Sequence, residues 1–336
     1  MANKYHDGLI VSSSPHQVSP VDTTKIMGTV MLALAPATAV GFYQFGIKAV
    51  ILTFVCIIAS VGFEYLFNLI MKRPQTVGDL SAALTGLLIA LNCPSSLPLN
   101  IAIVGCFCAI IVVKQLFGGI GQNVVNPAVT ARIFMFIAFA TEMTTWPLSR
   151  NEAVNAVIAN EDAMTGATAL GQLSHGDGTL SSVAYSNLDL FLGNCGGCIG
   201  EVSALALLIG GLFLIYMKVI SPLIPVTFLA TVAVIGLIWG GVDGAVFHLC
   251  AGGVMLGAFF CATEYVTSPT LPTGKIIFGI GCGLFTMLIR IFGSYPEGVS
   301  FAILLMNILT PFIDKFCEGR LFPAPKPAKG GDGDEK

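Results

Sequence analysis

Ten long apolar runs follow one another along this chain, and most of them approach the length of a membrane-spanning helix. Such a helix needs about 20 mostly apolar residues. Hydrophobic residues make up 55% of the 336 residues and charged residues only 10%, whereas a water-facing surface carries roughly 25–35% charged residues. The sequence therefore excludes a soluble globular protein and predicts an all-α polytopic membrane protein.

Breaks at Gly, Pro and charge clusters divide the apolar sequence into ten predicted spans, five on each side of an acidic segment. The predicted spans are 26–43, 47–70, 80–92, 97–117, 125–140, 202–218, 221–240, 245–262, 275–292 and 298–314. The corresponding regions are an N-terminal segment 1–25, a five-helix half 26–140, an acidic loop 141–200, a second five-helix half 201–314 and a polar tail 315–336.

Lys and Arg indicate the orientation of these spans, because cytoplasmic loops carry an excess of both. With a cytoplasmic N-terminus, twelve of the sixteen basic residues lie inside, Lys48, Arg150 and Arg290 lie outside, and Arg132 lies within a span. We therefore expect both termini to be cytoplasmic and the loop 141–200 to be extracytoplasmic. The basic residues form no stripe for nucleic acid, and the net charge is −3, so nucleic-acid binding is excluded.

An odd number of spans in each half means that the two halves enter the membrane from opposite sides, so any repeat is inverted. A trace of one is visible, since the Gly- and Pro-bounded stretch 86–98 is similar to the stretch 257–272. Broken apolar segments at matching positions of inverted halves indicate a binding site near the midplane. The alternative is that these residues reflect only the higher Gly and Pro content of membrane helices.

The acidic loop contains the run Asp162-Ala-Met-Thr165-Gly166-Ala167-Thr168, in which small residues surround two hydroxyl groups. The hydroxyls are sterically accessible, so one of them could accept a modification. From the residues alone this reading competes with an ordinary turn, because Thr hydroxyls commonly bond the local backbone.

The run has the pattern Asp-x-x-(Ser/Thr)-Gly-Ala-Thr, and with its context it resembles the NqrB/RnfD family of membrane electron-transfer subunits. The resemblance implies that a flavin transferase attaches FMN to Thr168 through a phosphoester, with Asp162, Thr165, Gly166 and Ala167 completing the motif. The short segment before the first span favours the Rnf branch over the quinone-reductase branch, whereas Ala163 departs from the family pattern. Further matching segments are 13–16, 78–88, 118–128, 199–206, 255–264 and 295–299.

This resemblance implies an electron carrier of an ion-translocating ferredoxin:NAD oxidoreductase (Rnf) complex in the bacterial cytoplasmic membrane. The implied partners are the FMN-bearing G subunit of such a complex, its membrane iron–sulfur A and E subunits, and the flavin transferase. A second, noncovalent flavin, riboflavin, is expected near Thr85, Gly86 and Asn126. The competing hypothesis is a solute transporter or channel with inverted repeats and no redox role, because fold alone does not fix function.

Charged residues within spans are costly, by about 2.5–3.5 kcal/mol at the bilayer centre, so Glu64 and Arg132 require partners. We expect Glu64 to face the helix bundle, either as a site for the coupling ion or in a structural pair with Arg132 or a backbone donor. Cys195 and Cys198 have the spacing of a tight turn with two structural thiols, of a redox disulfide, or of half a metal or iron–sulfur site shared with a partner. No pair of histidines has metal-binding spacing, so no catalytic metal is expected.

Overall fold

The computed structural model describes residues 22–150, 153, 166–175, 183–293 and 297–321. Within these ranges the chain forms α-helices, one short 3-10 helix and two π-helical segments, and it contains no β-strand. Five helices are long and apolar enough to cross a membrane, and several shorter apolar helices accompany them. The prediction of an all-helical, multi-pass membrane protein is therefore confirmed.

The helices follow the predicted spans closely. In the first half they are α1 (Thr23–Phe45), α2 (Ile47–Ile70), the 3-10 helix η1 (Val77–Asp79), α3 (Ser81–Leu91), α4 (Leu99–Phe107), the π-helix η2 (Cys108–Gln115) and α5 (Pro127–Ala138). In the connecting region they are α6 (Ala140–Met143), α8 (Ala169–His175) and α9 (Asn187–Leu192). In the second half they are α10 (Ala204–Tyr216), α11 (Leu223–Cys250), α12 (Val254–Leu256), the π-helix η4 (Gly257–Cys261), α13 (Pro272–Phe292) and α14 (Val299–Leu321).

The predicted span 245–262 is wrong as a single helix. Its first part continues α11, and its second part forms α12 and η4. The backbone breaks in between, where Ala251 is extended and Gly252 has a φ of 64°, a left-handed conformation that favours glycine. The predicted boundary after residue 240 is confirmed, because Gly240 and Gly241 interrupt the helical geometry of α11.

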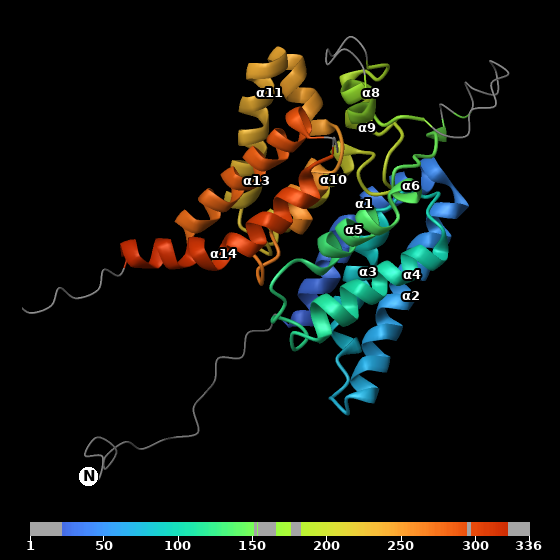
Figure 1. Cartoon of the computed structure of the whole chain (residues 1–336), viewed down its shortest axis with the longest axis vertical. Helices are drawn as coiled ribbons and strands as arrows, with labels where there is room; N and C mark the ends of the chain where they lie inside the picture. Colours follow the sequence, from blue (N-terminus) through green and yellow to red (C-terminus); the bar gives the residue numbers. More distant parts are fainter. Residues whose placement is uncertain (1–21, 151–152, 154–165, 176–182, 294–296, 322–336) are drawn as a thin grey trace, which may run out of the picture.

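The two halves lie side by side, with the first half coloured blue to green and the second coloured yellow to red in Figure 1. The first helices of the halves, α1 and α10, pack against each other, and so do the last, α5 and α14. This pairing fits two related five-span units, although the inverted relation between them remains a prediction. The helices α8 and α9 lie together at the upper end of the molecule.

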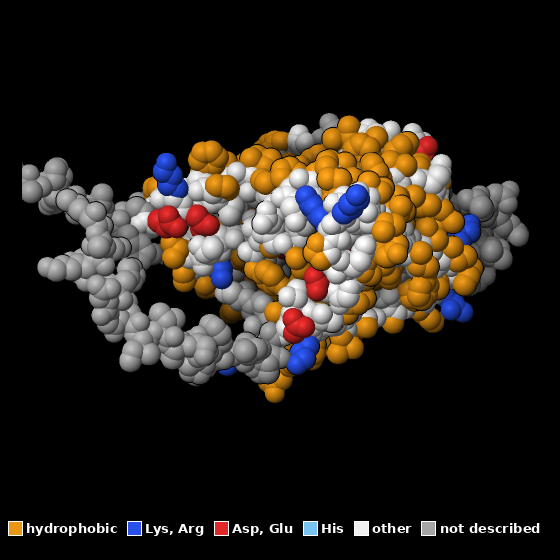
Figure 2. Space-filling model, turned by 90° about the horizontal axis from the view of Figure 1, so that it is seen from below, with side chains coloured by type: hydrophobic (Ala, Val, Ile, Leu, Met, Phe, Trp, Pro, Cys, Tyr) orange, Lys and Arg blue, Asp and Glu red, His pale blue; other side chains and the backbone are white. Residues whose placement is uncertain are grey.

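Apolar side chains cover much of the outer surface. Figure 2 shows them on the face seen from below, with charged side chains only in small, separate groups. Ile58, Ile137, Ile238 and Phe312 are among the large apolar side chains that point outward from the helices. An exposed apolar surface of this extent suits contact with lipid tails and with other membrane helices.

Glycines allow the helices to approach closely. A Cβ atom at Gly86 of α3 would lie 2.6 Å from the Cys56 carbonyl oxygen of α2, and one at Gly210 of α10 would meet the backbone of Ala33 in α1. Small residues at helix contacts are typical of membrane proteins, where dispersion contacts between close backbones stabilise association. The glycines in this sequence therefore allow close contacts between helices as well as breaks in the helices.

We expect Gly86→Ala to lower the free energy of unfolding by about 1–3 kcal/mol, because the added methyl group overpacks the contact between α3 and α2. Gly62→Ala is the matched control, since Gly62 is also helical and a Cβ there would meet nothing within 4 Å. Thermal unfolding of both variants in detergent measures the difference. Equal midpoints for the two variants would show that the contact tolerates a methyl group.

Candidate functional site

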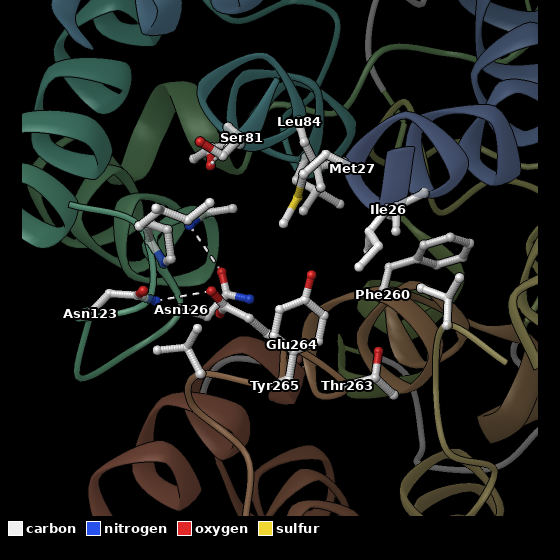
Figure 3. Close-up of a pocket in the computed structure, with 18 of the residues that line it drawn as sticks. Ile26, Met27, Ser81, Leu84, Asn123, Asn126, Phe260, Thr263, Glu264 and Tyr265 are labelled. Atoms are coloured by element: carbon white, nitrogen blue, oxygen red, sulfur yellow. Dashed lines mark hydrogen bonds between the residues drawn. The ribbon is translucent and has the colours of Figure 1, made fainter. Parts of the chain in front are cut away.

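A cavity of about 370 Å³ lies between the two halves. Its walls come from the start of α1, from α3, from the loop before α5, and from η4 with the segment that follows it (Figure 3). Its volume falls within the range of about 300–1,000 Å³ that is usual for small-molecule sites. Apolar lining residues include Ile26, Met27, Leu84, Phe259 and Phe260.

Polar groups meet on one side of this cavity. The Asn123 amide donates a hydrogen bond to Glu264 Oε1 at 2.9 Å, and the Thr267 hydroxyl donates to Glu264 Oε2 at 3.2 Å. The Tyr265 ring projects into the cavity with its hydroxyl foremost (Figure 3). Amide, carboxylate and phenol groups are thus available to a ligand that has both an aromatic body and a hydrogen-bonding edge.

Asn126 lines the cavity and also starts α5. Its Oδ1 accepts hydrogen bonds from the amides of Ala128 at 3.0 Å and Val129 at 3.2 Å, and its Nδ2 donates to the Cys261 carbonyl at 3.1 Å. Asn is a favoured N-cap residue, and Pro127 directly after it suits the first helical turn. The Asn126 side chain therefore caps the first turn of α5 in the protein interior, and it also lines the cavity.

Both π-helical segments contribute to the cavity wall. Lys114 comes from η2, and Phe259 and Phe260 come from η4. π-helical turns are rare and occur frequently at functional sites. Their presence on two sides of one cavity indicates that its shape depends on irregular helix geometry.

Lys114 also belongs to a buried ionic cluster beside the cavity. Its Nζ lies 3.2 Å from both carboxylate oxygens of Glu64 and donates to the Ser81 hydroxyl at 2.7 Å. Glu64 Oε1 also accepts from the Thr76 hydroxyl at 2.7 Å and from Gln115 Nε2 at 3.0 Å. Glu64 and Lys114 are both almost fully buried, so this is a solvent-excluded ion pair in which the carboxylate is well satisfied.

Thr168 lies in a different place, directly before α8. It is half-buried, and its Oγ1 accepts a hydrogen bond from the Gly171 amide at 3.1 Å. A Cβ atom at Gly171 would come within 3.2 Å of that oxygen, so the glycine keeps the space beside the hydroxyl open. Ala169 and Leu170 are buried and anchor the start of α8, with Leu170 packed against Gly252.

Only part of the remaining motif belongs to the described residues. The Gly166 amide donates to the Trp146 carbonyl at 3.1 Å, which attaches this segment to the loop after α6. Ala167 is exposed between Gly166 and Thr168. Asp162 and Thr165 lie outside the described residues.

A second buried ionic cluster lies beneath Thr168. The guanidinium group of Arg132 on α5 donates to Asn92 Oδ1 at 2.9 Å, contacts a carboxylate oxygen of Glu297 and lies 3.7 Å from Glu201 Oε2. Thr168, Glu201 and Glu297 together line a small cavity of about 20 Å³. The α5 helix therefore connects the two sites, since Asn126 lies on the larger cavity and Arg132 lies below Thr168.

Cys195 and Cys198 are not joined in a disulfide. Cys198 Sγ lies 3.3 Å from the Asn92 carbonyl oxygen and 3.5 Å from Arg132 Nη2. Ligand atoms of Cys198, Glu201 and Glu297 lie within 4.8 Å of one another, but the Arg132 guanidinium already contacts all three. With Arg132, this set forms an ion-pair network in the described structure.

The predicted membrane topology can be compared with these two sites. The large cavity is lined by residues in or near the loops that are predicted on one side of the membrane. One residue from each of these loops is Thr23, Ser81, Asn123, Ile220 and Glu264. The loops predicted on the other side meet around Arg132, where they supply Glu201, Glu297 and the Thr168 segment. The predicted alternation of the loops agrees with the structure, and which side is cytoplasmic stays a prediction.

Comparison with known proteins establishes the relationship of the chain. The model of the NQR2, RnfD, RnfE family matches residues 10–323. The chain belongs to this family. A relative from Acetobacterium woodii, named as the D subunit of a Na⁺-translocating ferredoxin:NAD⁺ oxidoreductase complex, is 47% identical over 320 residues, covering 95% of this chain and 96% of the relative.

Other family members show similar coverage. The D subunit of the proton-translocating ferredoxin:NAD⁺ oxidoreductase complex of Clostridium ljungdahlii is 41% identical, over 92% of this chain and 94% of the relative. The D subunit of the ion-translocating oxidoreductase complex of Stutzerimonas stutzeri is also 41% identical, over 89% and 91%. The resemblance to the NqrB/RnfD family is thereby confirmed, with the matches extending over almost the whole chain.

The expectations for individual residues in this family member have mixed outcomes. Glu64 faces the protein interior as expected, but its predicted pairing with Arg132 is wrong, because Glu64 pairs with Lys114 and Arg132 pairs with Glu201 and Glu297. Lys114 was not singled out from the sequence as a buried charge. The sequence did indicate a buried charge here, because Lys114 lies within the predicted span 97–117. A charged residue within a span requires a partner, as was argued for Arg132.

The three residues expected near a second flavin are not all on the cavity. Thr85 and Asn126 line it. Gly86 lies on another face of α3 and contacts Cys56, Ile57 and Ser60 of α2. The residues of the cavity that the sequence did not assign to a flavin site, above all Asn123, Glu264 and Tyr265, lie in loops that only the folded chain brings together.

Proposed function

We propose that this chain is the D subunit of an ion-translocating Rnf complex in the bacterial cytoplasmic membrane, and that it carries electrons through FMN esterified to Thr168. Relatives covering almost the entire chain are named as this subunit. The observation that carries the FMN assignment is the half-exposed Thr168 hydroxyl at the end of the flavin-attachment motif. The protein is an electron-transfer component and acts only with the other subunits of its complex.

The surroundings of Thr168 suit an attached FMN. The glycine at position 171 leaves room beside the acceptor oxygen, and the buried residues Ala169 and Leu170 hold the segment in place. The bound flavin would supply one- and two-electron redox chemistry, while the protein contributes position, electrostatics and exclusion of water. Thr168 holds the group, and Gly166, Ala167, Asp162 and Thr165 complete the sequence that the flavin transferase reads.

We further propose that the large cavity holds the noncovalent riboflavin. Its volume of about 370 Å³, its aromatic wall at Phe259 and Phe260, and its polar side at Asn123 and Glu264 suit a flat heteroaromatic ligand with a hydrogen-bonding edge. Thr85 and Asn126 also line this cavity.

The orientation of the chain and its partners belong to the same proposal. Thr168 would lie on the extracytoplasmic side, with the large cavity and the Glu64 cluster at the cytoplasmic side. Electrons would pass between Thr168 and the FMN-bearing G subunit, with the iron–sulfur A and E subunits beside this chain in the membrane. Glu64 is the candidate for contact with the coupling ion, because it is a carboxylate buried next to Lys114 and the cavity.

The covalent attachment predicts a simple result for the denatured chain. Co-expressed with a flavin transferase, the full-length protein should keep flavin fluorescence on a denaturing gel, because only a covalent bond survives denaturation. Thr168→Ala should abolish the signal, whereas Thr144→Ala, a matched exposed threonine after α6, should leave it unchanged. Fluorescence that persists in Thr168→Ala would place the acceptor elsewhere, and a dark wild-type chain would favour a permease without a redox role.

A further inference from the structure

The cluster beneath Thr168 contains one buried and one partly buried carboxylate, both with spare acceptor capacity. Among the described residues, Glu201 Oε2 and Glu297 Oε1 have no hydrogen-bond partner. Glu201 is only 5% exposed, and its other oxygen, Oε1, accepts from the Cys198 amide at 3.2 Å. Glu201 Oε2 lies 3.7 Å from Arg132 Nη2, an ion pair beyond hydrogen-bond distance, so both oxygens can still accept a hydrogen bond or a proton.

The small cavity connects these carboxylates to Thr168. Glu201, Glu297 and Thr168 all line it, and its volume of about 20 Å³ is enough for one water molecule, which requires about 10–15 Å³. A water in this position would have the carboxylates as polar partners. The carboxylates thus lie on a space large enough for water next to the proposed attachment oxygen.

The charges of the cluster are balanced. Two guanidinium groups act on the carboxylates. Arg132 from α5 pairs with both, and Arg290 from α13 lies nearby, with its Nε 3.5 Å from the backbone carbonyl oxygen of Glu297. Arg290 is held by the carbonyl oxygens of His248 at 2.7 Å and Ala251 at 2.8 Å. With both glutamates ionised the four side chains have no net charge, so a further electron next to the FMN phosphodiester on Thr168 would be uncompensated in a medium of low dielectric constant.

We propose that Glu201 and Glu297 form a proton-accepting pair that takes up one proton when one electron arrives at the flavin on Thr168. The inference rests on the proposed function. The electron comes from a reduced flavoprotein or iron–sulfur partner, and the proton comes from the aqueous phase on the same side. The proton forms one O–H bond with a carboxylate oxygen, no bond within the protein breaks, and the net charge of the site is unchanged.

Two physical effects favour this step. A negative charge near a carboxylate makes its ionised form less favourable and so increases its affinity for a proton. Glu297 also lies in the connection between α13 and α14, where burial raises its pKa against the opposing attraction of Arg132. The groups that face it are Arg132, Arg290, Glu201 and Cys198.

Infrared difference spectroscopy of the flavinylated complex tests the proposal. Reduction with dithionite should produce a new band of a protonated carboxylic C=O, which shifts to lower frequency in D₂O. Glu201→Gln and Glu297→Gln should each abolish or displace this band, because the two residues act as a pair. Glu318→Gln is the matched control, since this exposed carboxylate on α14 belongs to neither site, and it should leave the band unchanged.

Each result bears on the proposal. A flavinylated wild-type complex without the band, or a band that persists unaltered in both Gln variants, overturns the proton-accepting pair while leaving the flavin intact. A chain that carries no FMN by intact mass overturns this inference together with the proposed function. If a Gln variant fails to assemble, Glu297→Asp takes its place in the experiment. This variant retains a carboxylate at position 297 and should therefore give a shifted band.

Discussion

Replacement of Arg132 with methionine is expected to destabilise the protein by about 3–5 kcal/mol, because it leaves buried carboxylates without their counter-charge. Arg132 is the group that joins Glu201 and Glu297, and it also donates to Asn92 at the end of α3. Its loss therefore affects three segments of the chain at once. Thermal or denaturant unfolding of the purified subunit in detergent measures the change.

A matched pair of variants separates charge from packing at this position. Arg132→Lys keeps the positive charge but loses the fork of donors that reaches both Asn92 and the glutamates, so its stability should lie between those of the wild type and Arg132→Met. Arg132→Met combined with Glu297→Gln removes one of the unpaired charges and should recover part of the lost stability. A cost below about 1 kcal/mol for Arg132→Met would show that the network is not a structural element.

Lys114→Met is expected to have an effect of similar size in the other cluster, about 3–5 kcal/mol, because Glu64 would remain buried without its ion-pair partner. The double variant Glu64→Leu, Lys114→Met should be far more stable than Lys114→Met alone, since replacing both members of a buried pair with apolar residues is often neutral. The double-mutant cycle gives the coupling energy between the two residues.

The same double variant tests the role of Glu64 in ion coupling. If the carboxylate contacts the coupling ion, the stable double variant should assemble into the complex and transfer electrons without ion transport into vesicles. Transport at the wild-type rate would assign Glu64 a purely structural role. Gln115→Ala, which removes one hydrogen bond to Glu64 and no charge, serves as the control.

Much of the fold follows from local sequence patterns. The apolar runs predicted the helices because each span depends on its own composition, and the breaks at Gly46 and Gly240–Gly241 coincide with backbone conformations that glycine permits. The division of 245–262 was not predictable in this way. It depends on Gly252 allowing Leu170, which lies far earlier in the chain, to pack against the backbone.

The site was predictable to a lesser extent. Thr168 could be identified because its motif is contiguous, whereas the ion pairs join residues that are far apart in sequence, such as Glu64 with Lys114 and Arg132 with Glu297. The composition and spacing of the sequence predict that a buried charge needs a partner, but they do not predict which residue the helix packing brings next to it. The π-helical geometry of η2, which brings Lys114 to both Glu64 and the cavity, has no clear signature in the sequence.

Peptide mapping by mass spectrometry of the subunit, purified from a natively matured complex, tests the central claim most directly. We expect the peptide containing Thr168 to have gained the mass of one FMN less one water, and fragmentation to place the addition on Thr168. The same peptide recovered entirely without this addition, from a chain expressed together with its transferase, would contradict the assignment and would leave the protein without the electron carrier proposed for it.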